Sequence, residues 1–393
     1  VVRRACPVAE SRSTGSAARP PAYVADTDLC RTCGRAEHHL RCDVPITEGF
    51  ERNLARVASQ RGALELESSV APCAERCPLS LCIQGYAGHI AAGENAEALQ
   101  HVMARTPLPS SVCRVCDRPC EDGCVRRGLD EPVAINDLKR FVVDWAERER
   151  PDLLETPREP AHGTAVAIIG AGVAGLSAAH ELAVRGYSVT LFDAEARPGG
   201  LLTHGIPEYR LPAAQSARDI ERVLRLGVRF EGGKRLGHEI CLDDLSADFR
   251  AVFLAIGAHC SKTLALPGSD RDAAPRSIDA LGYLRAIRLD ADAPAGRQVV
   301  VIGGGNAAVD AARTALRRGA TGVTIACIEE LNAMPALRDE ITAAEHEGIT
   351  LRTGVRPLRF DDGALIVTGL TNGSELRLAC DLVIVAIGQE PDA

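Results

Sequence analysis

The sequence predicts an α/β protein with two Rossmann-like nucleotide-binding domains, preceded by an α-helical domain that carries cysteines. A glycine-rich turn joins an apolar strand pattern to a helix pattern at Gly170, and the same arrangement recurs at Gly303. Eleven of the fifteen cysteines lie before residue 125. A chain of 393 residues also exceeds the usual size of a single hydrophobic core, so several domains are expected.

Composition divides the chain into four segments. Residues 1–60 form an irregular cysteine-containing arm, and residues 61–155 show apolar side chains at helical spacing. Prolines and charges after residue 150 are typical of a linker. Residues 160–275 and 276–388 contain one glycine-rich turn each, so we expect one nucleotide-binding domain in each.

Charge and hydropathy exclude several classes of partner. The formal net charge is -8, and basic residues alternate with acidic ones, so neither nucleic acid nor an anionic membrane is expected as a partner. No apolar run approaches the length of a membrane span, and the first residues lack the apolar core of a secretory signal. We therefore expect a cytoplasmic protein, in which clustered cysteines indicate metal binding rather than disulfides.

The first glycine-rich turn, residues 169–175, reads Ile-Gly-Ala-Gly-Val-Ala-Gly. Gly170 permits a tight turn, Gly172 lets a pyrophosphate approach the backbone, and Gly175 lets the helix pack closely. Asp193 ends the next strand pattern, where a carboxylate can bind the hydroxyls of an adenosine ribose. Dinucleotide binding is the preferred interpretation, and a merely tight strand-to-helix turn is the alternative.

The second turn, residues 303–308, reads Gly-Gly-Gly-Asn-Ala-Ala. Two such turns in one chain predict two dinucleotides. The following strand pattern ends at Glu329 and Glu330, and an acidic side chain there binds the ribose 2'-hydroxyl while repelling the 2'-phosphate of NADP. NAD(H) is therefore predicted over NADP(H), and two solvated charges at a strand end are the alternative. The predicted contacts of this turn are Gly303, Gly305, Asn306, Ala307 and Glu329.

The cysteines before residue 125 form two close groups. These are Cys73, Cys77 and Cys82, and then Cys113, Cys116, Cys120 and Cys124. Thiolates repeated every three or four residues suit an iron-sulfur cluster. Zinc is the competing metal, but a zinc site needs only four ligands. Cys30 and Cys33 lie in the polar arm, and they are either ligands of a further cluster or not ligands at all.

Several short motifs occur in a characteristic order. They are Cys77-Pro78, Pro107–Pro109, Arg114–Cys116, Pro119–Glu121, Pro132–Ile135, Leu138–Phe141, Gly199–Leu202, Gly205–Pro207, Arg210–Pro212, Leu254–Ala258 and Met334–Ala336. From about residue 70 onward the chain resembles the small (beta) subunit of bacterial glutamate synthase and its relatives. These relatives include the N-terminal part of dihydropyrimidine dehydrogenase and the diaphorase-like subunits of formate dehydrogenases and hydrogenases.

The resemblance implies FAD on the first turn, NAD(P)H on the second, and one or two 4Fe-4S clusters in the helical domain. By position it assigns Cys77, Cys116 and Cys120 to one cluster, and Cys73 and Cys124 to the other, which Cys30 and Cys33 would complete. It also adds Gly200, Leu201, Arg210 and Gly257 to the expected cofactor-binding residues.

The chain departs from the family pattern at four places. Cys30 and Cys33 lie some forty residues before Cys73 rather than close upstream. Glu329 and Glu330 replace the paired arginines of the NADPH-using members.

Lys139 stands where dihydropyrimidine dehydrogenase has a glutamine ligand, so the fourth ligand of the first cluster is open, with Cys82 or Cys113 as local substitutes. The sequence ends at Ala393, where the family chain re-enters the flavin domain. Three explanations are compatible with that end: the sequence is a fragment, a partner chain completes the flavin site, or the FAD domain is open.

The resemblance implies an electron-transfer subunit that moves hydride between NAD(P)H and FAD, and single electrons to or from a partner. The partner would be an amidotransferase, a molybdenum or tungsten enzyme, a hydrogenase-type subunit or a ferredoxin. No side chain is expected as a catalytic acid or base, because the cofactors carry the chemistry. A scaffold subunit with an incomplete flavin site is one alternative. A disulfide reductase is disfavoured, because no C-x-x-C follows Cys124.

Overall fold

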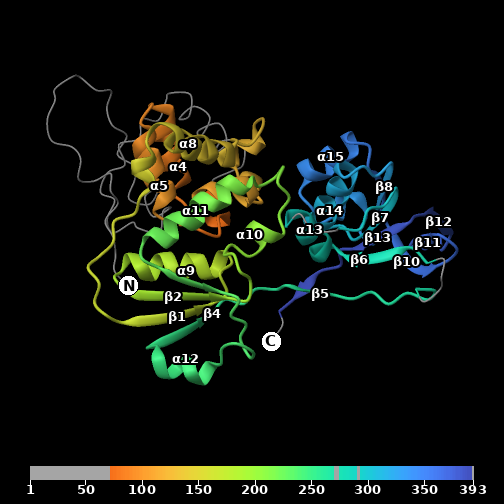
Figure 1. Ribbon diagram of the computed structural model, residues 1–393. Helices are drawn as coiled ribbons and strands as arrows, with labels where there is room; N and C mark the ends of the chain where they lie inside the picture. Colours follow the sequence, from red (N-terminus) through yellow and green to blue (C-terminus); the bar gives the residue numbers. More distant parts are fainter. Residues whose placement is uncertain (1–70, 270–273, 290–292, 392–393) are drawn as a thin grey trace. The chain divides into compact units, whose positions relative to one another are not determined.

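The computed structural model describes residues 71–269, 274–289 and 293–391 (Figure 1). They form two compact units. One contains the described chain up to Pro160 together with Glu221–Leu226, and the other contains Ala161–Ile220 and the chain from Gly227 onward. No helix among the described residues is long and apolar enough to cross a membrane.

The first unit is built from short helices. Their bounds are α3 (Pro72–Arg76), α4 (Ile83–Ala91), α5 (Asn95–Met103), α6 (Pro109–Val115), α7 (Pro119–Asp122), η4 (Val125–Gly128), α8 (Ile135–Glu149) and η5 (Pro151–Leu154). Proline occupies the first position of α3, α6 and α7, where its fixed φ and missing N–H suit a helix start. The cysteines therefore lie at the ends of short helices, close to the turns between them.

Helix α8 organises the core of this unit. Its buried side chains, including Ile135, Val142, Val143 and Ala146, recur at helical spacing and pack against α4 and α5. Its N-terminus is capped from α7, because the backbone N–H of Asn136 donates to Glu121 Oε1 at 2.8 Å. The thiols of α6 and α7 are thereby held beside α8.

The second unit begins with a parallel four-stranded sheet in the order β3-β2-β1-β4. Its elements are β1 (Ala165–Ile169), α9 (Val173–Val184), β2 (Ser188–Asp193), α10 (Leu201–His204), α11 (Ala213–Arg225), β3 (Arg229–Gly232), α12 (Leu242–Asp248) and β4 (Ala251–Leu254). The end of α11, from Glu221, is counted with the first unit. Figure 1 shows α9 over one face of the sheet and α12 on the other. The carboxyl ends of β1 and β4 lie side by side, which is where a doubly wound sheet binds its ligand.

A second parallel sheet follows, with five strands in the order β6-β13-β7-β8-β9. Its elements are β6 (Arg276–Asp279), α13 (Ala280–Arg288), β7 (Gln298–Ile302), α14 (Asn306–Arg317), β8 (Gly322–Ala326), η6 (Leu331–Ala333), α15 (Arg338–His346), β9 (Thr350–Arg352) and β13 (Leu382–Val385). The helices pack on one face of this sheet, where they contact Val299 and Val301. The other face, through Val300 and Ile302, packs on an antiparallel sheet of β10 (Val355–Phe360), β11 (Ala364–Gly369) and β12 (Glu375–Ala379).

Two short strands join the two sheets of this unit. Strand β5 (Cys260–Ser261) leaves the first sheet and pairs antiparallel with β14 (Gln389–Glu390), which follows the second sheet. The predicted fold class is confirmed: a helical cysteine-bearing segment precedes two Rossmann-like sheets, with one glycine turn between β1 and α9 and the other between β7 and α14.

Candidate functional site

The first glycine turn leaves no room for side chains at two of its positions. Gly170 has φ +103°, and a Cβ there would lie 2.2 Å from the carbonyl oxygen of Ala255. A Cβ at Gly175 would lie 1.8 Å from the carbonyl oxygen of Gly170. At Gly172 the nearest atom to such a Cβ is 3.9 Å away, so the N-terminus of α9 stays open. That opening is what a pyrophosphate needs in order to approach the backbone N–H groups.

Asp193, at the end of β2, holds the first turn in place. Its Oδ2 accepts a hydrogen bond from the N–H of Ala171 at 2.6 Å, and its Oδ1 accepts one from Glu195 at 2.7 Å. The predicted residue Gly200 also belongs to this site, because a Cβ there would lie 2.8 Å from Cα of Gly172. The structure thus brings Gly200 and Asp193 to the turn, although Asp193 already accepts two backbone hydrogen bonds.

Two further predicted residues flank this turn. Leu201 begins α10 directly after Gly200, and its side chain is exposed. Gly257 follows β4 with φ +74°, and no atom of the described chain lies within 4 Å of a Cβ built there. Both positions therefore leave space beside the backbone at the ligand-binding edge of the sheet.

The second glycine turn is built in the same way. Gly303 has φ +134°, and a Cβ there would lie 2.3 Å from the carbonyl oxygen of Ala386. Gly305 precedes α14 and has no atom within 4 Å of its Cβ position. Asn306 fixes the neighbouring loop, because its Oδ1 accepts the N–H of Leu337 at 2.9 Å. Ala307 follows it in the first turn of α14.

Glu329 is the most informative residue of this second turn. Its Oε2 lies 2.7 Å from the Cβ position of Gly304. The same oxygen is buried and has no hydrogen-bond partner among the described residues. Burial and the interaction of its side chain with the Glu329 carboxylate raise the pKa of the Cys327 thiol. Buried polar atoms are normally paired, so an Oε2 without a hydrogen bond beside a glycine turn fits a missing hydroxyl donor. The residues at this turn therefore fit a dinucleotide ribose.

The thiols of the helical unit form two neighbouring sets. Burial, together with the charges of Cys116 and Cys77, raises the pKa of the Cys120 thiol to about 12. Burial also raises the pKa of Cys73, and the charge of Cys124 acts in the same direction. The charge of Cys77 also raises the pKa of Cys73, so the thiols that the resemblance assigns to two clusters lie close to one another.

The cysteines in the described part of the chain are free thiols. In that part no group of three or more His, Cys, Asp or Glu side chains is arranged to hold a single metal ion. Soft thiolate donors suit an iron-sulfur cluster, which spreads its ligands further apart than a single ion does. The donor set therefore fits the cluster by its chemistry.

The two proposed substitute ligands, Cys113 and Cys82, make contacts of their own. Cys113 is buried on α6, where its Sγ donates to the carbonyl oxygen of Ser110 at 3.4 Å and accepts from Arg114 at 3.4 Å. Cys82 precedes α4, and its Sγ and His101 Nε2 lie 2.7 and 2.9 Å from the Cβ position of Gly85. A role for either one in the first cluster stays a prediction. Cys30 and Cys33 lie outside the described residues.

Lys139 is a further residue of the thiol site. Its side chain is 4% exposed, and its positive charge acts to lower the pKa of Cys120. The sequence showed only that Lys139 stands where dihydropyrimidine dehydrogenase has a glutamine ligand. Its place beside Cys120 indicates that it counteracts the negative charge of the thiolates.

Comparison with known proteins agrees with this geometry. Residues 164–393 match the family model described as pyridine nucleotide-disulphide oxidoreductase. The chain belongs to this family. Residues 44–151 match a second model, that of dihydropyrimidine dehydrogenase domain II with a 4Fe-4S cluster. The resemblance drawn from the motifs is therefore confirmed at the level of the family.

Two curated relatives are similar to most of this chain. The beta subunit of NADP(+)-dependent formate dehydrogenase from Moorella thermoacetica is 38% identical over 380 residues, covering 86% of this chain and 54% of that protein. The PreT subunit of NAD-dependent dihydropyrimidine dehydrogenase from Salmonella typhimurium is 32% identical over 347 residues, covering 88% and 82%. The chain thus spans about half the length of the Moorella relative.

A solved structure supports the fold alone. The 6-hydroxypseudooxynicotine amine oxidase of Pseudomonas geniculata is 20% identical, with a TM-score of 0.50, and the match covers 86% of this chain and 48% of that one. The likeness agrees with the two nucleotide-binding sheets of this family member.

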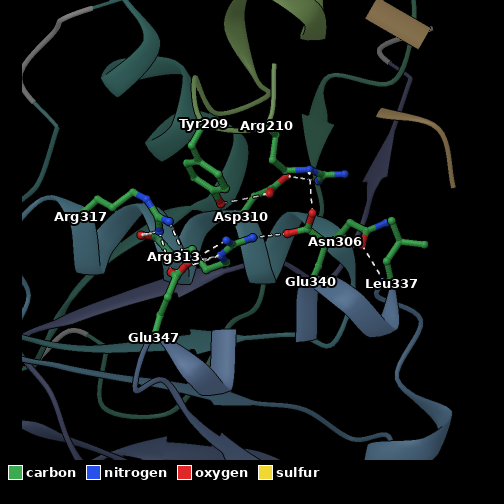
Figure 2. Close-up of polar contacts among 9 residues, drawn as sticks. All are labelled: Tyr209, Arg210, Asn306, Asp310, Arg313, Arg317, Leu337, Glu340 and Glu347. Atoms are coloured by element: carbon green, nitrogen blue, oxygen red, sulfur yellow. Dashed lines mark hydrogen bonds and ion pairs between the residues drawn. The ribbon is translucent and has the colours of Figure 1, made fainter. Parts of the chain in front are cut away.

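Arg210, predicted as a cofactor-binding residue, is engaged within the protein (Figure 2). Its Nη1 donates to Asp310 Oδ2 on α14 at 2.8 Å. Sequence reasoning missed Asp310, which is a buried carboxylate within a helix of small apolar residues. A charge at such a helix position is a signal that could have indicated a buried ion pair.

Proposed function

We propose that this chain is the electron-input oxidoreductase subunit of a larger enzyme. It would exchange hydride between NAD(H) and FAD, and exchange single electrons between FAD and 4Fe-4S clusters. The observation that carries this proposal is the pair of glycine turns in one unit, each closed to side chains by a neighbouring carbonyl group. A single turn would serve one nucleotide, whereas two turns serve a donor and an acceptor of hydride.

Each group of residues has a separate task. The turn at Gly172, with the N-terminus of α9, would hold the FAD pyrophosphate, and the turn at Gly305, with α14, would hold that of NAD(H). FAD, when bound, supplies the conversion between two-electron and one-electron transfer. The protein contributes binding and orientation, and no side chain has to move a proton.

The cysteines would hold the iron-sulfur clusters. Cys77, Cys116 and Cys120 are proposed as ligands of one cluster, and Cys73 and Cys124 as ligands of the second. The charges of Cys116 and Cys77 act on Cys120, and the charge of Cys124 acts on Cys73 more strongly than that of Cys77 does, which supports this grouping. Burial near α8 would tune the electron affinity of the clusters, because it limits access of water to the sulfur atoms.

NAD(H) is proposed over NADP(H). The unpaired Oε2 of Glu329 can accept a hydrogen bond from the ribose 2'-hydroxyl, whereas a 2'-phosphate would place two negative charges together in a buried site. The relatives differ in this respect: the Moorella protein is named for NADP(+), and the Salmonella protein for NAD. The preference for NAD(H) or NADP(H) therefore has to be inferred from the residues of this chain.

A partner catalytic subunit, and a location in the cytoplasm, are also proposed. Both named relatives are subunits of larger enzymes, which supports the existence of a partner. An amidotransferase, a molybdenum or tungsten enzyme and a hydrogenase-type subunit are the candidate types, with ferredoxin as a small carrier.

The test is cofactor content combined with nicotinamide specificity. The protein, purified without air, is expected to be yellow-brown, to contain FAD, iron and acid-labile sulfide, and to reduce an artificial dye faster with NADH than with NADPH. Protein that contains iron and sulfide but no FAD would instead support a scaffold subunit. Zinc in place of iron would contradict the electron-transfer proposal.

A further inference from the structure

Two residues in the loop between α10 and α11 reach helix α14 (Figure 2). Arg210 Nη1 donates to Asp310 Oδ2 at 2.8 Å, and the Tyr209 hydroxyl donates to Asp310 Oδ1 at 3.4 Å. The side chains of Arg210 and Asp310 are only 10% and 8% exposed. We call Tyr209, Arg210 and Asp310 the α14 latch.

The ring of Tyr209 is held by cations of α14. The guanidinium carbons of Arg313 and Arg317 lie 4.7 and 4.1 Å from the ring centroid. Both arginines also bind Glu347, each with a hydrogen bond of 2.7 Å. The aromatic side of the latch is therefore oriented by a second ion-pair network.

Glu340 on α15 links the two networks. Its carboxylate lies 3.6 Å from Arg210 Nε and also forms a close ion pair with Arg313. Around Tyr209, three arginines thus face three carboxylates, and the formal charges cancel. A partly buried network is stable only with such balance, because removing one member leaves a buried charge uncompensated.

The latch acts on the end of α14 that faces the second glycine turn. Asp310 lies one helical turn after Asn306, the first residue of α14, which directly follows Gly305. On the other side, the N–H of Arg210 is fixed by the carbonyl oxygen of Pro207 at 3.0 Å. This loop follows α10 and Gly200, whose backbone packs on the first glycine turn.

A second contact joins the same parts of this unit. Arg288 on α13 donates to the carbonyl oxygens of Leu202 and Thr203, at 3.4 and 3.3 Å. Loss of the latch would therefore leave the parts attached. It would free α14 to shift relative to the first turn.

We propose that the α14 latch is a positioning device that sets the second glycine turn at the distance and angle from the first that hydride transfer requires. The inference rests on the proposed function. Hydride transfer is sensitive to small displacements, and a misplacement of about 1 Å can cost roughly 100-fold in rate. Arg210 and Asp310 are accordingly positioning residues, which act through the two turns.

The latch should respond to pH through Asp310. The groups that face it are Arg210 and Tyr209 from the loop, Glu340 from α15, and Arg313 on its own helix. Burial raises the pKa of Asp310 to about 6, although Arg210 opposes the rise. The ion pair is therefore fully charged only above that pKa, and it weakens as the pH falls through it.

The experiment compares Arg210→Met with wild type in the purified full chain. We expect amide exchange in the first two turns of α14 to rise about 10-fold, because a local contact is lost. The dissociation constant for NADH should stay within about 3-fold, whereas the rate of flavin reduction by NADH should fall roughly 100-fold. The defect should shrink when the pH is lowered from about 8 to about 5, because Asp310 is then protonated in both proteins.

Two further variants serve as rescue and control. Arg210→Lys keeps the charge and should recover most of the rate. Arg359→Met removes an exposed ion pair with Glu375 on the antiparallel sheet, and it should change neither exchange nor rate.

Two results would overturn the latch. In the first, Arg210→Met changes neither the amide exchange of α14 nor the rate of flavin reduction by NADH. In the second, amide exchange rises equally over the whole unit. Failure of the wild type to bind FAD or NADH would contradict the proposed function instead. Even then the exchange pattern decides whether the latch holds α14.

Discussion

Replacement of Glu329 by Gln should have opposite effects on stability and on binding. The buried Oε2 of Glu329 has no hydrogen-bond partner among the described residues, so the unliganded protein carries an uncompensated polar atom. Such an atom costs about 1 to 3 kcal/mol. The substitution removes the negative charge from the glycine turn, so the unliganded protein should melt at the same temperature or higher.

Binding of NADH should weaken in the same variant. A hydrogen bond to a charged group contributes about 1.5 to 3 kcal/mol, so its loss raises the dissociation constant roughly 10- to 150-fold. NADPH should lose much less affinity, because the repulsion between the carboxylate and the 2'-phosphate disappears. The preference for NADH over NADPH should therefore decrease in Glu329→Gln.

The assay is fluorescence titration of both nicotinamides together with thermal unfolding. Glu330→Gln is the matched control, because this neighbouring carboxylate is exposed and should change neither quantity. The reasoning is refuted if Glu329→Gln lowers the melting temperature while leaving the NADH affinity intact. That outcome would make Glu329 a structural residue instead of a ribose ligand.

Three other substitutions test the flavin turn and the thiol site. Gly175→Ala should lower both the melting temperature and the FAD content, because its Cβ would lie 1.8 Å from the carbonyl oxygen of Gly170, and FAD analysis with thermal unfolding measures both. Cys116→Ser should abolish electron delivery to the partner but leave NADH reduction of a flavin-level dye largely intact, and equal loss of both in paired assays would contradict the order of carriers. Lys139→Gln should lower the reduction potential of the nearby cluster, because a positive charge beside Cys120 favours the reduced state, and a spectroscopic redox titration that shows no shift or a rise would count against this role.

The sequence predicted the two glycine turns because each is marked by a short motif between a strand pattern and a helix pattern. Only the clash at Gly175 is local, since it involves Gly170. The clashes at Gly170 and Gly303 involve Ala255 and Ala386, which follow the neighbouring strands β4 and β13 and are far away in the sequence. For Glu329, the position at a strand end was enough to place it near the second turn.

The α14 latch could not be predicted in this way. Arg210 and Asp310 are 100 residues apart, and their pairing depends on how the loop after α10 meets α14. The motif around Arg210 indicated only a residue near the cofactors. Spacing also failed to show that Cys113 faces Arg114, because the direction of a side chain at a helix end depends on the packing around it.

The central claim is that electrons pass from NADH through FAD to the thiolate-bound clusters. Rapid mixing of the anaerobic protein with NADH tests it most directly, with flavin absorbance and the cluster signal in electron paramagnetic resonance followed in time. The flavin band should bleach first, and the cluster signal should then grow at the rate at which the flavin band recovers. Bleaching that no cluster signal follows, or a cluster signal that precedes the bleaching, would contradict the proposed path.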